Sequence, residues 1–126
     1  MPIAEINAVT GRSPEQKALL LETVRDVILD TLQVEEEAVS VWLREFPYDC
    51  VLGAGSAAGK RTVIRITCFS GRTPDIKRRL YSSLAERLAS IGEDPAMSVM
   101  TMSESPLVDW GIHGGKCAAD VLAHRQ

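Results

Sequence analysis

The sequence lacks the features that mark membrane-spanning, secreted and nucleic-acid-binding chains. No apolar stretch approaches the roughly 18–20 residues of a membrane-spanning helix. Residues 1–12 have neither the basic start nor the long apolar run of a signal peptide. The net charge of -3 gives no electrostatic basis for binding nucleic acid or a membrane surface. We therefore expect a cytoplasmic protein with neither of these partners.

Disulfide frameworks and metal-ligand clusters are also missing from the sequence. The three cysteines, Cys50, Cys68 and Cys117, are an odd number at unrelated spacings, which is typical of reduced thiols in the cytoplasm. The acidic run at residues 35–37 has no histidine or further carboxylate placed with it. We interpret that run as a solvated connection and not as a metal site.

The glycine-rich stretch at residues 55–60 does not match a phosphate-binding loop. Its spacing differs from G-x-x-x-x-G-K-[ST], Arg61 stands where the hydroxyl residue would be, and a strand-like sequence follows. Small residues in this composition are typical of a flexible connection, and we take residues 53–60 as a linker.

What the chain does contain is one pattern, present twice. Its 126 residues, 45% of them hydrophobic, fit one globular domain or two small repeats that share a core. In the first half, residues 2–9 alternate as a strand does, an amphipathic helix of about 19 residues begins after Ser13, and residues 39–45 form a second strand. Ser13 and Gln16 are spaced as a capping box, and Pro14 suits the first helical position.

The second half repeats this pattern about sixty residues later. Residues 71–74, Gly-Arg-Thr-Pro, correspond to residues 11–14, Gly-Arg-Ser-Pro. The expected strand, helix and strand cover residues 61–69, 74–91 and 97–102. We therefore divide the single domain, residues 1–126, into repeats at 1–52 and 61–115.

This pattern predicts an α/β (α+β) fold built from a tandem βαβ repeat. A crossover helix makes the two strands that it connects parallel, and the connection is right-handed. The expected architecture is a four-stranded sheet with two helices on one face. Such a sheet leaves its edges and helix flanks incompletely covered, so we expect an oligomer.

The first two residues, Met1 and Pro2, form the candidate catalytic feature. If Met1 is removed, the ring nitrogen of Pro2 becomes a secondary amine, which can act as a base, whereas an amide nitrogen cannot. Such α-amino groups titrate near pH ~7.7–8, and burial beside cationic residues lowers this pKa, so the amine is free at neutral pH. The equivalent position in the second repeat is Thr62, whose nitrogen is an internal amide.

Several of these motifs together resemble the tautomerase superfamily. The runs at residues 2–6 and 11–17 are similar to the start of 4-oxalocrotonate tautomerase, a single-βαβ member. The second half, through residues 109–116, is similar to malonate semialdehyde decarboxylase and its fused two-repeat relatives. The resemblance implies the tautomerase/MIF-like fold, a homotrimer, small carboxylate substrates held by arginines, and no metal or organic cofactor. It also implies an N-terminal proline that is the general base in tautomerases. In the decarboxylase and dehalogenase branches, the proline is either a general acid or a group that acts through covalent chemistry.

Two arginines hold equivalent places, since Arg12 and Arg72 each follow the glycine after the first strand of a repeat. In fused relatives, second-half arginines serve the proline, so we expect Arg72 to bind the substrate first and Arg12 second. The alternative for Arg12 is that it faces Thr62. A planar guanidinium can hold a carboxylate with two parallel hydrogen bonds, and its charge lowers the pKa of a nearby amine.

At some positions, this sequence has a different residue type from the relatives that it resembles. Ser40 stands where the small tautomerase has an arginine and Ser70 where the decarboxylase has one, so we count both serines as substrate-binding positions. Ala38 replaces the decarboxylase's aspartate, and Glu37 beside it is expected to face the other way on a strand. The water-activating pair of the dehalogenases is not recognisable, although Glu104 is nearby. These gaps favour simple tautomerisation.

Aromatic residues give further candidates. Trp110 follows the fourth strand, where it is either an aromatic wall over the substrate or a packing residue of the trimer. His113, in a glycine-rich tail, either lines the site or lies at a surface or interface. Trp42 alternates with Val41 on a core strand, which favours a packing role.

The sequence as a whole favours a cofactor-independent keto–enol tautomerase, an isomerase of small 2-oxo acids. In this hypothesis Pro2 moves the proton, and Arg72, with Arg12, holds the carboxylate. The first alternative is a lyase, either a decarboxylase or a hydratase or dehalogenase, that acts on a small acid. The second is a non-catalytic trimeric binding module, which a retained Met1 would favour.

Overall fold

The computed structural model describes residues 1–53 and 61–122, and these form two βαβ units followed by a short C-terminal segment. The first unit consists of β1 (Ile3–Val9), α1 (Pro14–Leu32) and β2 (Ser40–Phe46). The second consists of β3 (Thr62–Phe69), α2 (Pro74–Ser90) and β4 (Ser98–Ser105). Short 3-10 turns follow each helix and each second strand, at η1 (Glu36–Ala38), η2 (Tyr48–Cys50), η4 (Pro95–Met97) and η5 (Leu107–Asp109).

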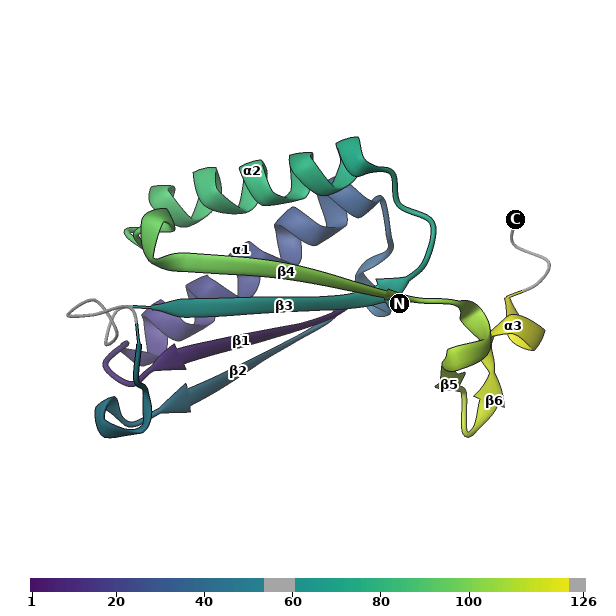
Figure 1. Ribbon diagram of the computed structural model, residues 1–126, viewed down its shortest axis with the longest axis horizontal. Helices are drawn as coiled ribbons and strands as arrows, with labels where there is room; N and C mark the ends of the chain where they lie inside the picture. The colour runs from purple at the N-terminus through teal and green to yellow at the C-terminus, as the bar shows by residue number, and fades with distance from the viewer. Residues whose placement is uncertain (54–60, 123–126) are drawn as a thin grey trace.

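The four long strands form one sheet in the order β2-β1-β3-β4. β1 is parallel to β2 and β3 is parallel to β4, while β1 and β3 meet antiparallel at the centre, with Ile6 opposite Ile64. Both helices lie on the same face of this sheet (Figure 1). The predicted tandem βαβ architecture is therefore confirmed, and the antiparallel central pair relates the two units by an approximate twofold axis.

The helix starts follow from the local sequence. The Ser13 side chain accepts a hydrogen bond from the backbone N–H of Gln16, and the Gln16 side chain accepts one from the Ser13 N–H, which confirms the predicted capping box. At the start of α2, the Thr73 hydroxyl accepts a hydrogen bond from the Ile76 N–H and so caps this helix. Each cap contributes about 1 kcal/mol and fixes where the chain turns from strand to helix.

The core lies between the sheet and the two helices. Alternate residues of β1 and β3 are buried on the helical side, and each helix contributes a stripe at helical spacing. Burying one such Leu or Ile side chain contributes about 1.5–3 kcal/mol. The central residues of this cluster are Ile6, Leu20, Ile28, Ile64, Ile66, Leu80, Leu84 and Leu88.

The other face of the sheet is not covered by helices. Trp42 on β2 lies on this face with 65% of its surface exposed, and its indole N–H donates to the Ser40 hydroxyl at 3.2 Å. The prediction that Trp42 packs in a core strand is therefore wrong for the single chain. The predicted alternation is present in β2, with Val41 and Leu43 pointing to the helices and Trp42 to the open face.

The C-terminal segment adds structure that the sequence pattern did not predict. After β4, which runs three residues further than expected, come β5 (Gly111–Ile112), β6 (Lys116–Cys117) and α3 (Ala118–Val121). This segment projects beyond the sheet end where the N-terminus lies (Figure 1). The predicted linker, residues 53–60, lies outside the described residues except for Gly53. In the described part of the chain, no helix combines the length and the apolar character that crossing a membrane requires.

Candidate functional site

The candidate site is a cavity at the sheet end that carries the N-terminus. Its volume is about 400 Å³. The lining comes from the N-terminus, the η1 turn, the end of β3 and the C-terminal segment, through Met1, Glu35, Glu37, Ala38, Phe69, Leu107, Ile112, His113 and Leu122. Segments far apart in sequence therefore meet around the start of the chain.

Strand pairing fixes the position of Pro2. Ile3 pairs with Thr67 in the antiparallel β1–β3 ladder, which sets Pro2 opposite Cys68. The Ser40 N–H donates to the Pro2 carbonyl at 3.3 Å, so β2 holds it from the other side. Pro2 is fully buried, as is Cys68. Met1 is present in this chain, so the Pro2 nitrogen is an amide here and the free amine belongs to Met1.

Arg72 is held at the same end of the sheet. Its Nη1 donates to the Phe69 carbonyl at 3.0 Å. Its backbone N–H and that of Gly71 donate to Glu104 Oε2 at 3.1 and 3.0 Å, and Lys77 forms an ion pair with the other Glu104 oxygen. In residues 1–53 and 61–122, the guanidinium makes no hydrogen bond beyond the one to Phe69, which leaves its Nε and Nη2 donors available to a ligand.

The environment of the N-terminus favours a neutral amine. Burial, and then the positive charge of Arg72, lower the pKa of the Met1 amino group from 8.0 to about 6. Burial also raises the pKa of the Cys68 thiol, so this cysteine is held in its neutral form beneath the site. An amine placed here is mostly unprotonated at pH 7, which is the state that a general base requires.

Arg12 lies at the opposite end of the sheet, beside Thr62. Its Nε and Nη2 donate to Glu93 Oε1 at 3.1 and 2.5 Å, and Nη2 also donates to the Thr62 hydroxyl at 3.3 Å. Of the two alternatives for this residue, the structure places Arg12 at the Thr62 end. Within one chain it does not reach the cavity at Pro2.

Family comparisons agree with the repeat. One family model described as "Tautomerase enzyme" matches residues 51–113, half of the chain, and a second with the same description matches residues 2–61. The chain belongs to the tautomerase family. The two matches together cover both βαβ units, which confirms the expected fused two-repeat member.

Known relatives of this tautomerase include single-repeat and fused proteins. A probable tautomerase of Halalkalibacterium halodurans is 38% identical over 61 residues, which cover 48% of this chain and 93% of the relative. A native fused 4-OT structure is 26% identical with a TM-score of 0.85, over 94% of this chain and 98% of that one. The FG41 malonate semialdehyde decarboxylase inhibited by 3-bromopropiolate is 22% identical with a TM-score of 0.83, over 96% and 95% of the two chains, and shows the shared fold alone.

The remaining predicted site residues of the tautomerase lie at different distances from its cavity. His113 lines the cavity directly. Trp110 does not; its ring packs edge-on against Phe69 with centroids 5.1 Å apart, and its indole N–H donates to the Ser105 carbonyl at 3.2 Å. Trp110 therefore supports the wall that Phe69 provides.

The two serines lie beside the tautomerase site without lining its cavity. Ser40 is exposed and contacts Pro2 through its backbone N–H. Ser70 is also exposed, and its N–H donates to the Ser105 carbonyl at 3.1 Å. Both positions are compatible with a ligand that extends outward from the cavity.

Sequence reasoning missed two carboxylates at the cavity of the tautomerase. Glu35 and Glu37 both line it, although Glu37 was expected to face away from the Ala38 position. That expectation was wrong because residues 36–38 form a 3-10 turn and not a strand, so alternation does not apply to them. Within the described ranges, no three His, Cys, Asp or Glu side chains are arranged to hold a metal ion.

Proposed function

We propose that this protein is a cofactor-independent keto–enol tautomerase, an isomerase of small 2-oxo acids, in which Pro2 is the general base after removal of Met1. The observation that carries the proposal is the burial of the chain start beside Arg72, with an amine pKa lowered to about 6. Removal of Met1 would transfer the free amine to the Pro2 nitrogen, one residue along the chain and still at the buried sheet end. The same burial and the same cation would act on it in the same direction.

The reaction needs one proton carrier and one charge stabiliser. In the ketonisation of an enol, the Pro2 amine accepts the hydroxyl proton, the electron pair forms the C=O bond, and the protonated amine returns a proton to the β-carbon. The enzyme therefore ends the cycle in the state in which it began. Burial from water keeps the amine neutral between turnovers and strengthens the electrostatic interactions within the site.

Arg72 is the proposed partner of the substrate carboxylate. Its Nε and Nη2 donors can form two parallel hydrogen bonds to a carboxylate, and its charge favours the enolate that develops on the adjacent oxygen. The hydrogen bond to the Phe69 carbonyl and the two backbone bonds to Glu104 fix the guanidinium before the substrate arrives. Arg12, which is engaged with Glu93, has no role in this site within one chain.

We extend the proposal to the assembly and the cellular location. Related fused 4-OT structures are described as trimers, and the helix-free sheet face with exposed Trp42 supports a homotrimer here. The three cysteines all lie in the described part of the chain and none is in a disulfide, which supports a reducing cytoplasm.

Replacement of the proposed base tests the mechanism. We expect Pro2→Ala to lower kcat/KM for a phenylenolpyruvate-type enol by about 10²-fold, near the low end for loss of general base catalysis because a primary amine remains. Pro14→Ala, at the exposed start of α1, is the matched control and should keep its rate. Intact mass must establish that Met1 is absent from both variants and from the wild type. Equal rates for Pro2→Ala and the wild type would contradict the mechanism.

A lyase is the second candidate, favoured by the carboxylates of Glu35 and Glu37 at the cavity. Either side chain can activate a water molecule for hydration, which simple tautomerisation does not require. Release of carbon dioxide or halide from a three-carbon acid without ketonisation of an enol would select this branch. A retained Met1 with no turnover of either class would instead select the non-catalytic binding module.

A further inference from the structure

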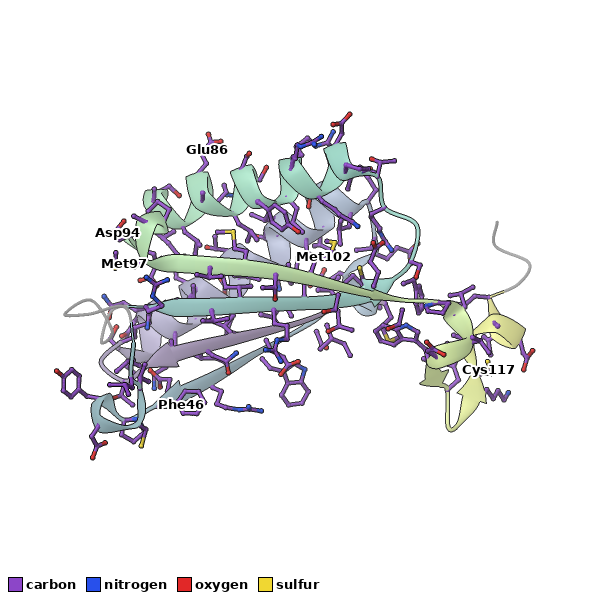
Figure 2. The ribbon with its side chains drawn as sticks, in the orientation of Figure 1. Phe46, Glu86, Asp94, Met97, Met102 and Cys117 are labelled. Atoms are coloured by element: carbon purple, nitrogen blue, oxygen red, sulfur yellow. The ribbon has the colours of Figure 1, made fainter. Side chains whose placement is uncertain are left out.

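A second cavity lies at the opposite end of the sheet, at the position that the internal repeat relates to the Pro2 site. Its volume is about 370 Å³. Its lining comes from the β1–α1 connection, the start of β3 and the connection after α2, through Val9, Thr10, Gly11, Arg12, Thr62, Gly92, Glu93, Asp94 and Ser98. Figure 2 shows Asp94 at this end of the molecule and Cys117, in the C-terminal segment, at the other.

The two arginines of the repeat share one hydrogen bond and differ in the rest. Arg12 Nη1 donates to the Val9 carbonyl at 3.5 Å, as Arg72 Nη1 does to the equivalent Phe69 carbonyl at 3.0 Å. Arg12 then directs Nε and Nη2 at the Glu93 carboxylate. Among the described residues, the corresponding donors of Arg72 have no partner. The Glu93 carboxylate thus stands where a ligand carboxylate would stand on Arg72.

The repeat also explains why only one end has this carboxylate. Each helix is followed by a residue with a left-handed backbone, Gln33 after α1 and Gly92 after α2, and three residues later a 3-10 turn begins. Glu93 therefore occupies the position of Val34 in the first repeat. Val34 packs against the core and offers no charge to Arg72.

The Arg12–Glu93 pair is partly withdrawn from water. The side chains are 17% and 23% exposed, so solvent screens the pair less than it screens a surface salt bridge. Two donors of one guanidinium converge on one carboxylate oxygen, and the Thr62 hydroxyl accepts a further bond from the same guanidinium. The Glu93 carboxylate therefore makes the contacts with Arg12 that a bound small carboxylate would make.

We propose that the Arg12 cavity is a second carboxylate-binding site, which the chain's own Glu93 occupies as an internal ligand. Each chain then binds one small carboxylate and not two. The Arg12 cavity then neither binds a substrate carboxylate nor catalyses the reaction, since the Thr62 nitrogen beside it is an amide and not a base. The inference takes Arg72 as its template, and to that extent it rests on the proposed function.

The test counts binding sites with a 2-oxo acid that cannot enolise. Benzoylformate has a carboxylate and an adjacent carbonyl but no β-hydrogen, so it binds without turnover. Calorimetric titration of the full-length protein gives the number of sites per chain. Backbone amide shifts at Gly11 and Gly71 report which end is occupied. We expect one site in the wild type, with shifts at Gly71 alone.

Glu93→Val gives the second repeat the residue that the first has at position 34. We expect it to bind two benzoylformate molecules per chain, the second with shifts at Gly11. Glu93→Gln, which keeps the shape of the side chain and removes its charge, is the second variant and decides the outcome if Glu93→Val does not fold. Asp94→Asn is the matched control, because Asp94 lines the same cavity, caps η4 through the Ala96 N–H and forms no hydrogen bond or ion pair with Arg12 in the described structure. It should keep a single site.

The outcomes separate this inference from the proposed function. One site in the wild type and still one in the folded Glu93 variants would overturn the internal-ligand proposal and leave the function of Arg72 intact. A second site in Asp94→Asn, or two sites already in the wild type, would also overturn it. If the wild type binds no benzoylformate and Glu93→Val binds one molecule near Gly11, the internal-ligand proposal stands and the proposed role of Arg72 fails.

Discussion

At the scale of single residues, the chain uses two arginines from the same sequence motif in opposite ways. Both are anchored to the last carbonyl of a strand, through Val9 for Arg12 and Phe69 for Arg72. Their electrostatic surroundings differ, because Glu93 pairs with Arg12, whereas Arg72 lowers the pKa of the half-buried N-terminal amine. Arg72 alone therefore has both charge and hydrogen-bonding capacity to offer a substrate.

Removal of the Arg72 charge should alter both rate and pH dependence. Because a cation disfavours protonation of the neighbouring amine, Arg72→Ala should move the ascending limb of the kcat/KM–pH profile to higher pH, although burial, the larger cause of the low amine pKa, remains. Loss of two charge-assisted hydrogen bonds should lower kcat/KM by about 10²-fold or more. Arg72→Lys keeps the charge, so it should keep the low pKa while it loses much of the rate.

Arg78→Ala is the control for the Arg72 prediction. It removes an equal charge, that of an arginine on α2 which forms an exposed ion pair with Asp75 of the same helix. It should leave the profile unchanged. An ascending limb at the same pH in Arg72→Ala and in the wild type would show that burial alone lowers the amine pKa.

Local sequence patterns identified these residues, but only the resemblance to fused relatives favoured Arg72 over Arg12 at the Pro2 end. The repeat motif located Arg12 and Arg72, and the dipeptide Met1-Pro2 located the candidate base. Which arginine meets Pro2 depends on the antiparallel pairing of β1 with β3, a contact between residues about sixty positions apart that no local pattern encodes. The role of Glu93 depends on the same long-range pairing.

At the scale of elements, the end of β4 positions the candidate site. Glu104 links β4 to the start of α2 by accepting from the Gly71 and Arg72 N–H groups and by pairing with Lys77. The hydrogen bond from Lys77, together with the backbone bonds, lowers the pKa of the Glu104 carboxyl. Glu45 and Lys17 form the equivalent pair at the other end, at 2.9 Å, but Glu45 Oε2 has no partner among the described residues.

This asymmetry predicts that Glu104 is a positioning residue. Glu104→Ala should raise KM for the proposed 2-oxo acid substrate by about tenfold, the cost of about one hydrogen bond to a charged group, with little change in kcat. Glu104→Gln, which keeps an acceptor for the two N–H groups, should recover most of this loss. Glu45→Gln should affect stability alone. Equal KM values for Glu104→Ala and the wild type would contradict the positioning role.

The stability of the same variants should depend on pH. Because the folded pKa of Glu104 lies below its unfolded value near pH ~4.3, its bonds stabilise the fold fully above that pH, and the effect is lost as the pH falls through the folded pKa. The difference in urea midpoint between Glu104→Gln and the wild type should therefore shrink on acidification below pH ~4.

Elements with a strong period were predictable, and the short ones were not. The capping box, the two helices and the four strands each follow from local spacing, and they have nearly the expected bounds. The η1 turn and the β5–β6–α3 segment have too few residues to establish a period. These short segments supply Glu35, Glu37, Ile112 and His113 to the cavity. The sequence therefore predicted the helices and strands that support the site better than the residues that line it.

At the scale of the whole molecule, the sheet has one closed and one open face. The helices bury the first, and the second carries Trp42, 65% exposed, and Val99, 41% exposed, on the two edge strands. Apolar residues exposed on a sheet face and at its edges mark an association surface. The approximate twofold axis of the chain also places similar surfaces at β2 and β4, which allows one kind of contact to repeat around a closed ring.

Substitution of Trp42 should therefore disrupt the assembly and not the fold of the chain. Trp42→Asp places a charge in the proposed interface, where an unpaired carboxylate would be desolvated, so we expect sedimentation to report a monomer or a mixture, and the proposed trimer for the wild type. Because Trp42 is exposed in the single chain, far-UV circular dichroism should remain unchanged. Leu19→Glu, at a position 43% exposed on α1 in the helical layer, is the matched control and should sediment as the wild type does. A Trp42→Asp protein of unchanged mass would show that the open face is not the interface.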